Sequence, residues 1–262
     1  MSAPSMLQPG SFADRVAVVT GGGSGIGEAI AVELARLGAL VVVVGRTADR
    51  LDRVVERITA EGWRAVSAVL DVRDRDAVER MVSDVVAEHG RIDHLVNSAA
   101  GQFRVAPHEL SPGGWQAVVD IVLHGTWHCT QVVGQHMIER GGGGSVLSIG
   151  SNMANQGGPD TVHSASAKAG VVAMTKSLAG AWGPHDIRLN VLVPGMTEGT
   201  AGVDILFRDE ASLRAAIEGV PLARLVGRQE VADAACYLLS DYASYITGTQ
   251  LVIDGGRALG RH

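Results

Sequence analysis

Cysteine, long apolar runs and clusters of one charge are all scarce in this 262-residue sequence. Cys129 and Cys236 stand far apart without CxxC spacing, which argues against a disulfide framework or a cysteine metal site. Apolar runs such as residues 39–44 have strand length and are far too short to span a bilayer. No metal is expected at His124 and His128 either, because no HExxH motif and no nearby carboxylate partner accompany them.

Charge and targeting signals exclude further classes of protein. The formal net charge is −6, and no basic tract interleaved with aromatic residues suggests a nucleic-acid partner. Residues 1–11 carry Ser and Pro but neither a positive n-region nor a long apolar segment, so we expect a flexible N-terminal arm instead of a signal peptide. The sequence therefore favours a soluble, cytoplasmic protein that acts on a small molecule and has no membrane partner.

Apolar segments of strand length alternate with amphipathic segments of helix length. The expected strands are residues 16–20, 40–44, 65–70, 94–97, 145–149, 189–193 and 250–253. The expected helices are residues 27–37, 48–60, 76–89, 115–139 and 166–182. Runs of Val, Ile and Leu predict strands buried on both faces, and regular β-α alternation predicts right-handed crossovers. The sequence thus predicts an α/β fold with a doubly wound parallel sheet, the Rossmann fold, in a three-layer αβα sandwich.

No shift in composition marks a domain boundary, so we expect residues 1–262 to form a single Rossmann-type domain. The periodic pattern loosens between residues 196 and 220. We expect this segment to form a lid over the substrate site.

The first expected strand runs into the sequence TGGGSGIG at residues 20–27, and a helix follows. Glycines allow a tight turn and a close approach of the backbone to a pyrophosphate, and the helix N-terminus offers free N–H groups. A glycine-rich turn alone is often structural, but its place between the first strand and the first helix predicts a nicotinamide dinucleotide site. The site residues expected in this turn are Thr20, Gly21, Gly23, Ser24, Gly25, Ile26 and Gly27.

The end of the second strand indicates which dinucleotide binds. A carboxylate at this point would bind the adenosine ribose and repel a 2′-phosphate, but the sequence has Arg46 there. The cation favours NADPH, with Ser24 and Thr47 as further phosphate donors, and a solvated surface arginine is the alternative. Asp71 and Val72 close the third strand and suit an adenine pocket, in which Asp71 accepts the exocyclic amine. Alternatively, Asp71 only caps the next helix.

Several motifs together resemble the short-chain dehydrogenase/reductase family over about residues 12–256. They are the glycine motif, NSAAG at 97–101, Lys168 on a long expected helix, and Pro-Gly at 194–195. Within the family, the chain is most similar to the 2,4-dienoyl-CoA reductases and the trans-2-enoyl-CoA reductases. The sequences that carry this closer likeness are AAGQF at 99–103, DIVL at 120–123, HSASAKAG at 163–170 and SDYAS at 240–244.

The resemblance implies roles for individual residues. Lys168 matches the family lysine that binds the nicotinamide ribose hydroxyls, and Ser151 matches the serine that orients the substrate. Thr200 is a second candidate, beside Thr197, for a position near the diphosphate. Further cofactor positions implied by the resemblance are Asn97, Ala99, Pro194, Gly195, Met196 and Thr197.

The resemblance also implies a homotetramer that pairs the two long helices, 115–139 and 166–182. Residues 169–173 and Leu178 are unusually apolar for a helix face in contact with solvent, which agrees with such a pairing.

The usual acid of the family, a tyrosine four residues before the lysine, is missing. That position is Ser164, and Met153 stands where dienoyl-CoA reductases can place a tyrosine instead. The three tyrosines, Tyr237, Tyr242 and Tyr245, all lie near the C-terminus. Because a serine hydroxyl is a poor acid, alcohol oxidation is disfavoured. Reduction of a carbon–carbon double bond needs only hydrogen-bond donors to the developing enolate oxygen.

The expected donors are Gln102, Ser151, Ser164 and the Lys168 ammonium. Together with these donors, the resemblance implies an NADPH-dependent reductase of enoyl- or 2,4-dienoyl-CoA thioesters, in fatty acid metabolism. One alternative is a carbonyl reductase or alcohol dehydrogenase with a different acid, such as His163. Another is an NADP-binding protein without turnover.

Overall fold

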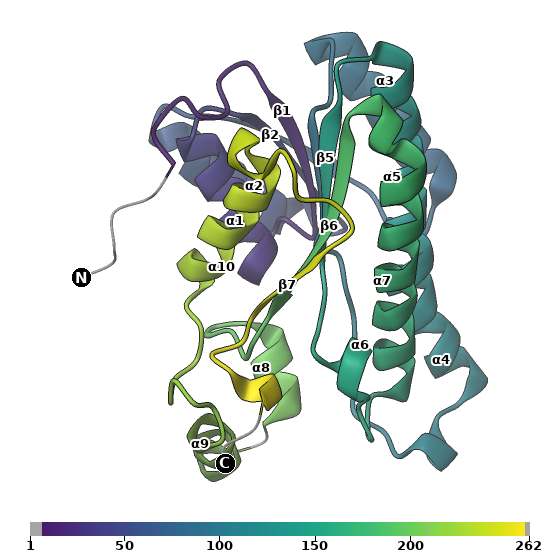
Figure 1. The fold of residues 1–262 in the computed structure, drawn as a ribbon, viewed down its shortest axis with the longest axis vertical. Helices are drawn as coiled ribbons and strands as arrows, with labels where there is room; N and C mark the ends of the chain where they lie inside the picture. The colour runs from purple at the N-terminus through teal and green to yellow at the C-terminus, as the bar shows by residue number, and fades with distance from the viewer. Residues whose placement is uncertain (1–6, 208, 260–262) are drawn as a thin grey trace.

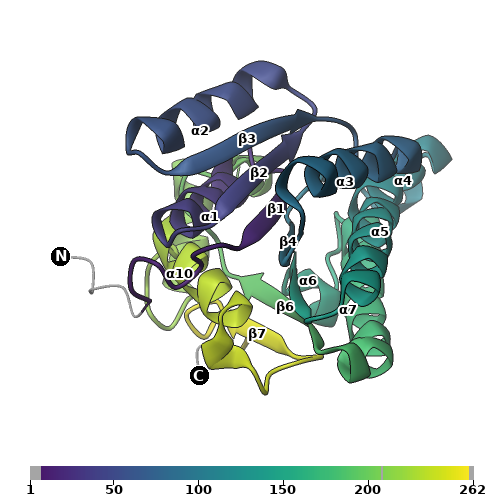
Figure 2. The ribbon, with the colours of Figure 1, turned by 90° about the horizontal axis from the view of Figure 1, so that it is seen from above.

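The computed structural model describes residues 7–207 and 209–259. Seven parallel strands form one sheet in the order β3-β2-β1-β4-β5-β6-β7, with helices on both faces (Figures 1 and 2). The strands are β1 Val16–Thr20, β2 Leu40–Gly45, β3 Arg64–Val69, β4 His94–Asn97, β5 Gly144–Ile149, β6 Ile187–Pro194 and β7 Gln250–Ile253. This confirms the predicted doubly wound sheet and its three layers.

The helices that cover the two faces of the sheet come from different parts of the chain. The helices are α1 Gly25–Arg36, α2 Ala48–Ala60, α3 Arg75–His89, α4 Pro112–Val119, α5 Gly125–Arg140, α6 Met153–Gln156, α7 Val162–Trp182, α8 Ala201–Leu206, α9 Glu210–Glu218 and α10 Arg228–Leu239. One face of the sheet is covered by α1, α2 and α10, and the other by α3, α5 and α7 (Figure 2). The central strands are buried on both faces, which explains their continuous apolar runs.

The start of α3 shows how local sequence sets a helix boundary. The Asp74 carboxylate accepts a hydrogen bond from the backbone N–H of Ala77, and the helix ends at Gly90, which has φ of +78°. Asp71 is therefore not the cap of this helix, contrary to the alternative interpretation of that residue.

The helix expected over residues 115–139 is interrupted. It consists of α4 and α5 joined by one π-helical turn, Asp120–His124. His124 contacts the Asp120 carboxylate at 2.8 Å, so the expectation that no carboxylate accompanies it was wrong. The ring of His128 instead bonds the carbonyl of Val72 at 3.2 Å. The two histidines thus form hydrogen bonds with different partners.

The N-terminal segment is packed more firmly than the sequence suggested. Leu7 and Phe12 are buried in the core beside α1 and α10, and the backbone N–H of Gly10 donates to the carbonyl of Leu37. Leu7 and Phe12 are thus buried on either side of residues 8–11, which are exposed. Residues 1–6 of the expected arm lie outside the described residues.

The segment 196–220 contains α8 and α9. Both helices lie at the end of the molecule where α6 also lies, which is the end toward which the carboxyl ends of the strands point (Figure 1). Within the described part of the chain, no helix is both long and apolar enough to cross a membrane.

Candidate active site

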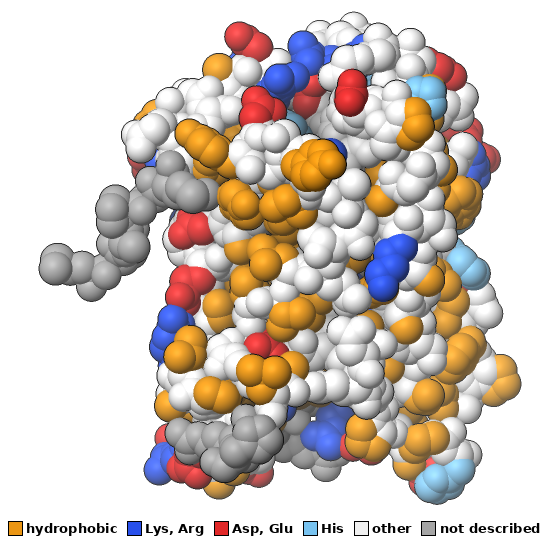
Figure 3. All heavy atoms as spheres, viewed as in Figure 1, with side chains coloured by type: hydrophobic (Ala, Val, Ile, Leu, Met, Phe, Trp, Pro, Cys, Tyr) orange, Lys and Arg blue, Asp and Glu red, His pale blue; other side chains and the backbone are white. Residues whose placement is uncertain are grey.

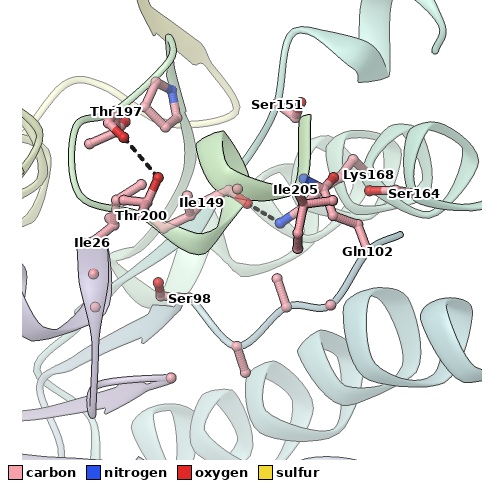
Figure 4. Close-up of a pocket in the computed structure, with 18 of the residues that line it drawn as sticks. Ile26, Ser98, Gln102, Ile149, Ser151, Ser164, Lys168, Thr197, Thr200 and Ile205 are labelled. Carbon is pink, nitrogen blue, oxygen red and sulfur yellow. Dashed lines mark hydrogen bonds between the residues drawn. The ribbon is translucent and has the colours of Figure 1, made fainter. Parts of the chain in front are cut away.

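A cavity of about 720 Å³ opens at the carboxyl ends of the parallel strands. Its wall is built from the turn after β1, the chain segments that follow the other six strands, and the helices α7 and α8. Ligands of open α/β sheets bind at this edge, beside the point where the strand order reverses. In the view of Figure 4, Gln102, Ser164 and Lys168 form one group, and Ile26, Thr197 and Thr200 lie at the other end.

The glycine turn forms a cradle that no larger residue could form. Gly21 has φ of +66°, and a Cβ atom there would lie 2.8 Å from the backbone N of Ala99 and the carbonyl O of Ser98. A Cβ at Gly27 would lie 2.3 Å from the carbonyl O of Gly21. The side chain of Ser24, at the start of α1, makes no capping hydrogen bond in the described structure, so the N–H groups of the first turn are free for an anion. The cradle fits a pyrophosphate.

The end of the cavity beside β2 is basic. Arg46 and Arg50 both line it and are exposed, and within the described ranges neither makes a side-chain hydrogen bond or salt bridge. Asp71 and Val72 form the wall beside them. Hydrogen bonds from Arg73 hold the pKa of Asp71 below its usual value, so this carboxylate is ionised and already paired.

Two residues expected to contact the cofactor stand behind the wall. The Thr20 hydroxyl oxygen accepts hydrogen bonds from the backbone N–H groups of Ser98 and Ala99 at 3.1 and 3.2 Å. The Asn97 amide donates to the Thr130 hydroxyl at 2.9 Å. Neither side chain lines the cavity. They position the turn after β4, and every other residue expected to bind the cofactor does lie in the wall.

Lys168 is the charged centre of the substrate end. Its ammonium is almost completely buried on α7 and donates to the carbonyl of Ile149 (Figure 4). Burial lowers the pKa of Lys168 to about 8. Ser164 lies one helical turn earlier on the same face of α7, where the family tyrosine would stand.

Hydroxyl and amide groups line the same cavity as this lysine. Ser164 is buried, lines the cavity, and its hydroxyl has no hydrogen-bond partner in the described part of the chain. Ser151 and Gln102 line the same end. The amide of Gln102 faces α8, since a Cβ at Gly202 would lie 3.8 Å from its nitrogen. The structure thus brings together all four expected catalytic residues.

Tyrosine contributes nothing to this wall. Tyr237, a residue of α10, packs against the core, while Tyr242 and Tyr245 are exposed, and none of the three lines the cavity. The sulfur of Met153 accepts a hydrogen bond from the Thr161 hydroxyl at 3.2 Å, and both residues line the cavity. The site therefore offers amide, hydroxyl and ammonium donors, without a phenol.

His163 stands apart from the other polar residues of α7. Its ring is fully buried against Phe103, with ring centroids 4.4 Å apart, and it does not line the cavity. Burial lowers the pKa of the His163 imidazole, which favours the neutral form. A neutral ring outside the wall is poorly placed to protonate a substrate.

Sequence reasoning missed several wall residues. Arg50 lies in the first turn of α2, directly after the end of β2, so its place at the start of that helix could have revealed it. Arg104 and Asp160 form an ion pair at 2.5 Å, and Arg104 also donates to the carbonyl of Leu206 in α8. No local pattern could have paired these residues, because their contact depends on the tertiary fold.

Known proteins are similar to this chain in sequence and in fold. The family model described as Enoyl-(Acyl carrier protein) reductase matches residues 21–258. A Bacillus subtilis protein named "Probable 2,4-dienoyl-CoA reductase [(2E)-enoyl-CoA-producing]" is 39% identical over 246 residues, which is 94% of this chain and 97% of the relative. The crystal structure of a short chain dehydrogenase from Bacillus anthracis has a TM-score of 0.87 at 39% identity, covering 95% of this chain and 98% of that one.

A third relative contains a cofactor. The structure from Beutenbergia cavernae, named for an NAD(P)-dependent gluconate 5-dehydrogenase, has bound NADP. Its TM-score is 0.91 at 34% identity, and the match covers 96% of this chain and all of that chain. The chain belongs to the short-chain dehydrogenase/reductase family. It is an oxidoreductase of this family, whose members bind a nicotinamide cofactor.

Proposed function

We propose that this enzyme uses NADPH to reduce a carbon–carbon double bond of a 2-enoyl- or 2,4-dienoyl-CoA thioester. The observation that carries the proposal is the convergence of Gln102, Ser151, Ser164 and Lys168 in a wall that contains no tyrosine. The likeness to a relative named as a 2,4-dienoyl-CoA reductase supports the same substrate class.

NADPH is favoured over NADH by the cations after β2. Arg46 and Arg50 line the cavity and have no salt-bridge partner in the described ranges, so both are free to bind a 2′-phosphate. Guanidinium groups bind phosphate through charge-assisted hydrogen bonds. No carboxylate stands where it would bind the ribose hydroxyls of NADH at the end of β2.

The bound cofactor would supply a hydride to the distal carbon of the double bond. Negative charge then develops on the thioester oxygen, and the donors of the wall stabilise it there. Gln102 is the first such donor, with the hydroxyls of Ser151 and Ser164 beside it. A well-placed donor of this kind contributes about 3 to 4 kcal/mol to the transition state. Lys168 would hold the nicotinamide ribose and adds positive potential. Water protonates the carbon of the enolate.

We also propose that the segment 196–220 acts as the lid over this site. Its residues Ile205, Leu206 and Phe207 are among those that line the cavity, and their apolar side chains suit an acyl chain. The hydrogen bond from Arg104 to the carbonyl of Leu206 holds α8 against the substrate end. A cytoplasmic location, expected from the sequence, forms part of the same proposal.

We also propose a homotetramer, but the structure supports it through a different surface from the one that the sequence suggested. Val171 and Val172 are buried within the chain itself, whereas residues 169, 170 and 178 are half-buried and Ala173 is exposed, so only part of this apolar stretch faces solvent. The face over α10, β7 and α7 shows many hydrophobic and few charged side chains (Figure 3), and Val252 on the edge strand is 41% exposed. This face suits a contact between subunits.

The proposed function is tested by NADPH consumption with crotonyl-CoA and 2,4-hexadienoyl-CoA beside a panel of ketones and alcohols. Thioester turnover is expected, with little or no carbonyl turnover. Gln102→Ala should lower kcat by on the order of 100-fold with a smaller change in KM, because its hydrogen bond strengthens as the enolate forms. His163→Ala should be mild by comparison.

Two results would contradict the proposal. If His163→Ala abolished ketone reduction and Gln102→Ala left it intact, the enzyme would be a carbonyl reductase with a histidine acid. Tight NADPH binding without turnover of any thioester or carbonyl would indicate a protein that only binds the cofactor.

A further inference from the structure

The charged side chains of the cavity wall differ in whether they are paired. Both carboxylates of the wall are held by arginines: Arg73 pairs with Asp71, and Arg104 pairs with Asp160. The arginines of the wall that make no side-chain hydrogen bond or salt bridge to a described residue are Arg46, Arg50 and Arg257. These three guanidinium groups are available to anionic ligands.

The three free arginines stand at opposite ends of the site. Arg46 and Arg50 follow β2, whereas Arg257 follows β7, and five steps of the sheet separate these strands. At about 4.8 Å per step, the two strand ends lie roughly 24 Å apart. Ser151 follows β5, which lies between them. Arg257 is therefore on the far side of the reacting groups from the cations assigned to the cofactor.

The turn that carries Arg257 is fixed to the substrate end. Asp254 is buried, and its carboxylate accepts hydrogen bonds from two backbone N–H groups of the turn at 2.9 and 2.8 Å. The same carboxylate accepts from the Asn152 amide at 2.8 Å, next to Ser151. The Gln156 amide donates to the carbonyl of Ala258 at 3.3 Å. The backbone of this turn is thus held against α6 and the catalytic segment.

We propose that Arg257 binds a phosphate group of the acyl carrier and so makes the enzyme selective for coenzyme A thioesters over thioesters without phosphate. The proposal rests on the proposed function, because it names the part of the same substrate that lies beyond the thioester. About 10 Å of sheet separates the end of β5 from the end of β7. The first anionic groups beyond the thioester of an acyl-CoA are its phosphates, and guanidinium binds them well.

The test compares two substrates that share the reacting atoms. Crotonyl-CoA carries phosphates, and the crotonyl thioester of N-acetylcysteamine carries none. Arg257→Ala should raise KM for crotonyl-CoA about threefold to tenfold, the range for a partly solvated charge-assisted contact. It should leave KM for the N-acetylcysteamine thioester within about twofold of wild type, since that substrate cannot reach the arginine.

Two further variants sharpen the result. Arg257→Lys keeps the charge and should restore part of the affinity for crotonyl-CoA. Arg80→Ala removes an exposed arginine of α3 that does not line the cavity, so it changes net charge equally and should change neither KM. Crotonyl-phosphopantetheine identifies the phosphate: a loss equal to that with CoA assigns Arg257 to the innermost one, and a smaller loss assigns it to those of the nucleotide.

The two proposals fail in different ways. Turnover of the N-acetylcysteamine thioester by the wild-type enzyme supports double-bond reduction without any phosphate contact. If that turnover is present and Arg257→Ala affects both thioesters equally, or neither, the phosphate site is refuted while the proposed function stands. If wild type reduces neither thioester, both are wrong.

Discussion

Replacing Lys168 by methionine should abolish activity and yet stabilise the fold at neutral pH. The fall in the pKa of this lysine from 10.5 to about 8 corresponds to roughly 3 kcal/mol, at about 1.4 kcal/mol per factor of ten. This is the cost of holding an ammonium in a buried position. Losing the hydrogen bond to Ile149 removes roughly 1 kcal/mol of stabilisation. The net gain for Lys168→Met is therefore about 2 kcal/mol.

The pKa of Lys168 also determines how the stability difference between Lys168→Met and wild type changes with pH. The folded chain favours neutral Lys168, so below pH 8 the charged lysine costs stability in full, and the cost disappears as pH rises from about 8 to 10.5. The advantage of Lys168→Met should accordingly be largest at pH 7 and shrink at pH 9.5. Urea unfolding at one fixed protein concentration, followed by tryptophan fluorescence without cofactor, measures both values.

Lys176 provides the control. It lies two helical turns later on α7 and is exposed, so Lys176→Met removes the same charge without relieving any burial. It should change the free energy of unfolding by less than about 0.5 kcal/mol. A Lys168→Met variant that unfolds at lower urea than wild type at pH 7 would refute the reasoning, because burial would then not be the dominant effect on this lysine.

Other perturbations follow from the same structure. Arg46→Ala should weaken NADPH binding about tenfold and leave NADH nearly unchanged, and equal losses in a titration of both cofactors would contradict the assignment. Gly21→Ala should prevent cofactor binding by fluorescence titration, because its Cβ would meet backbone at 2.8 Å. Burial lowers the pKa of His94 from 6.5 to about 3, so stability should fall as pH drops below 6.5, by up to about 1.4 kcal/mol per pH unit. In His94→Gln this slope should be lost in urea titrations. Light scattering should show a tetramer, and a monomer at micromolar concentration would refute that.

The strands were predictable because each is a short apolar run bounded by polar or glycine residues. Their predicted ends differ from the observed ends by no more than two residues, as in β6, Ile187–Pro194. The division of the helix over residues 115–139 was not predictable, since a π turn such as Asp120–His124 leaves the apolar pattern intact. The burial of Leu7 depends on a tertiary contact with the core beside α1, which no local period encodes.

Some residues of the candidate site could be predicted from the sequence. They are those whose place at a strand end or on a helix turn is enough to bring them to the cavity. Arg46, Ser151 and Lys168 are of this kind, and all line the cavity. The direction of the Asn97 side chain was not predictable, because its place at the end of β4 does not say which way the side chain points. That side chain turns inward to Thr130 on α5, a direction set by packing between elements distant in sequence.

The turn at Asp254 has a consequence for regulation. Its carboxylate ties the end of β7, an edge strand, to the segment that carries Ser151 and Asn152. A second subunit that docks along β7 would restrict the motion of this turn. Through the hydrogen bond it would also restrict Asn152 and the neighbouring Ser151. Specific activity should then depend on enzyme concentration, falling on dilution as β7 loses its neighbour, even though each subunit contains a complete set of reacting groups.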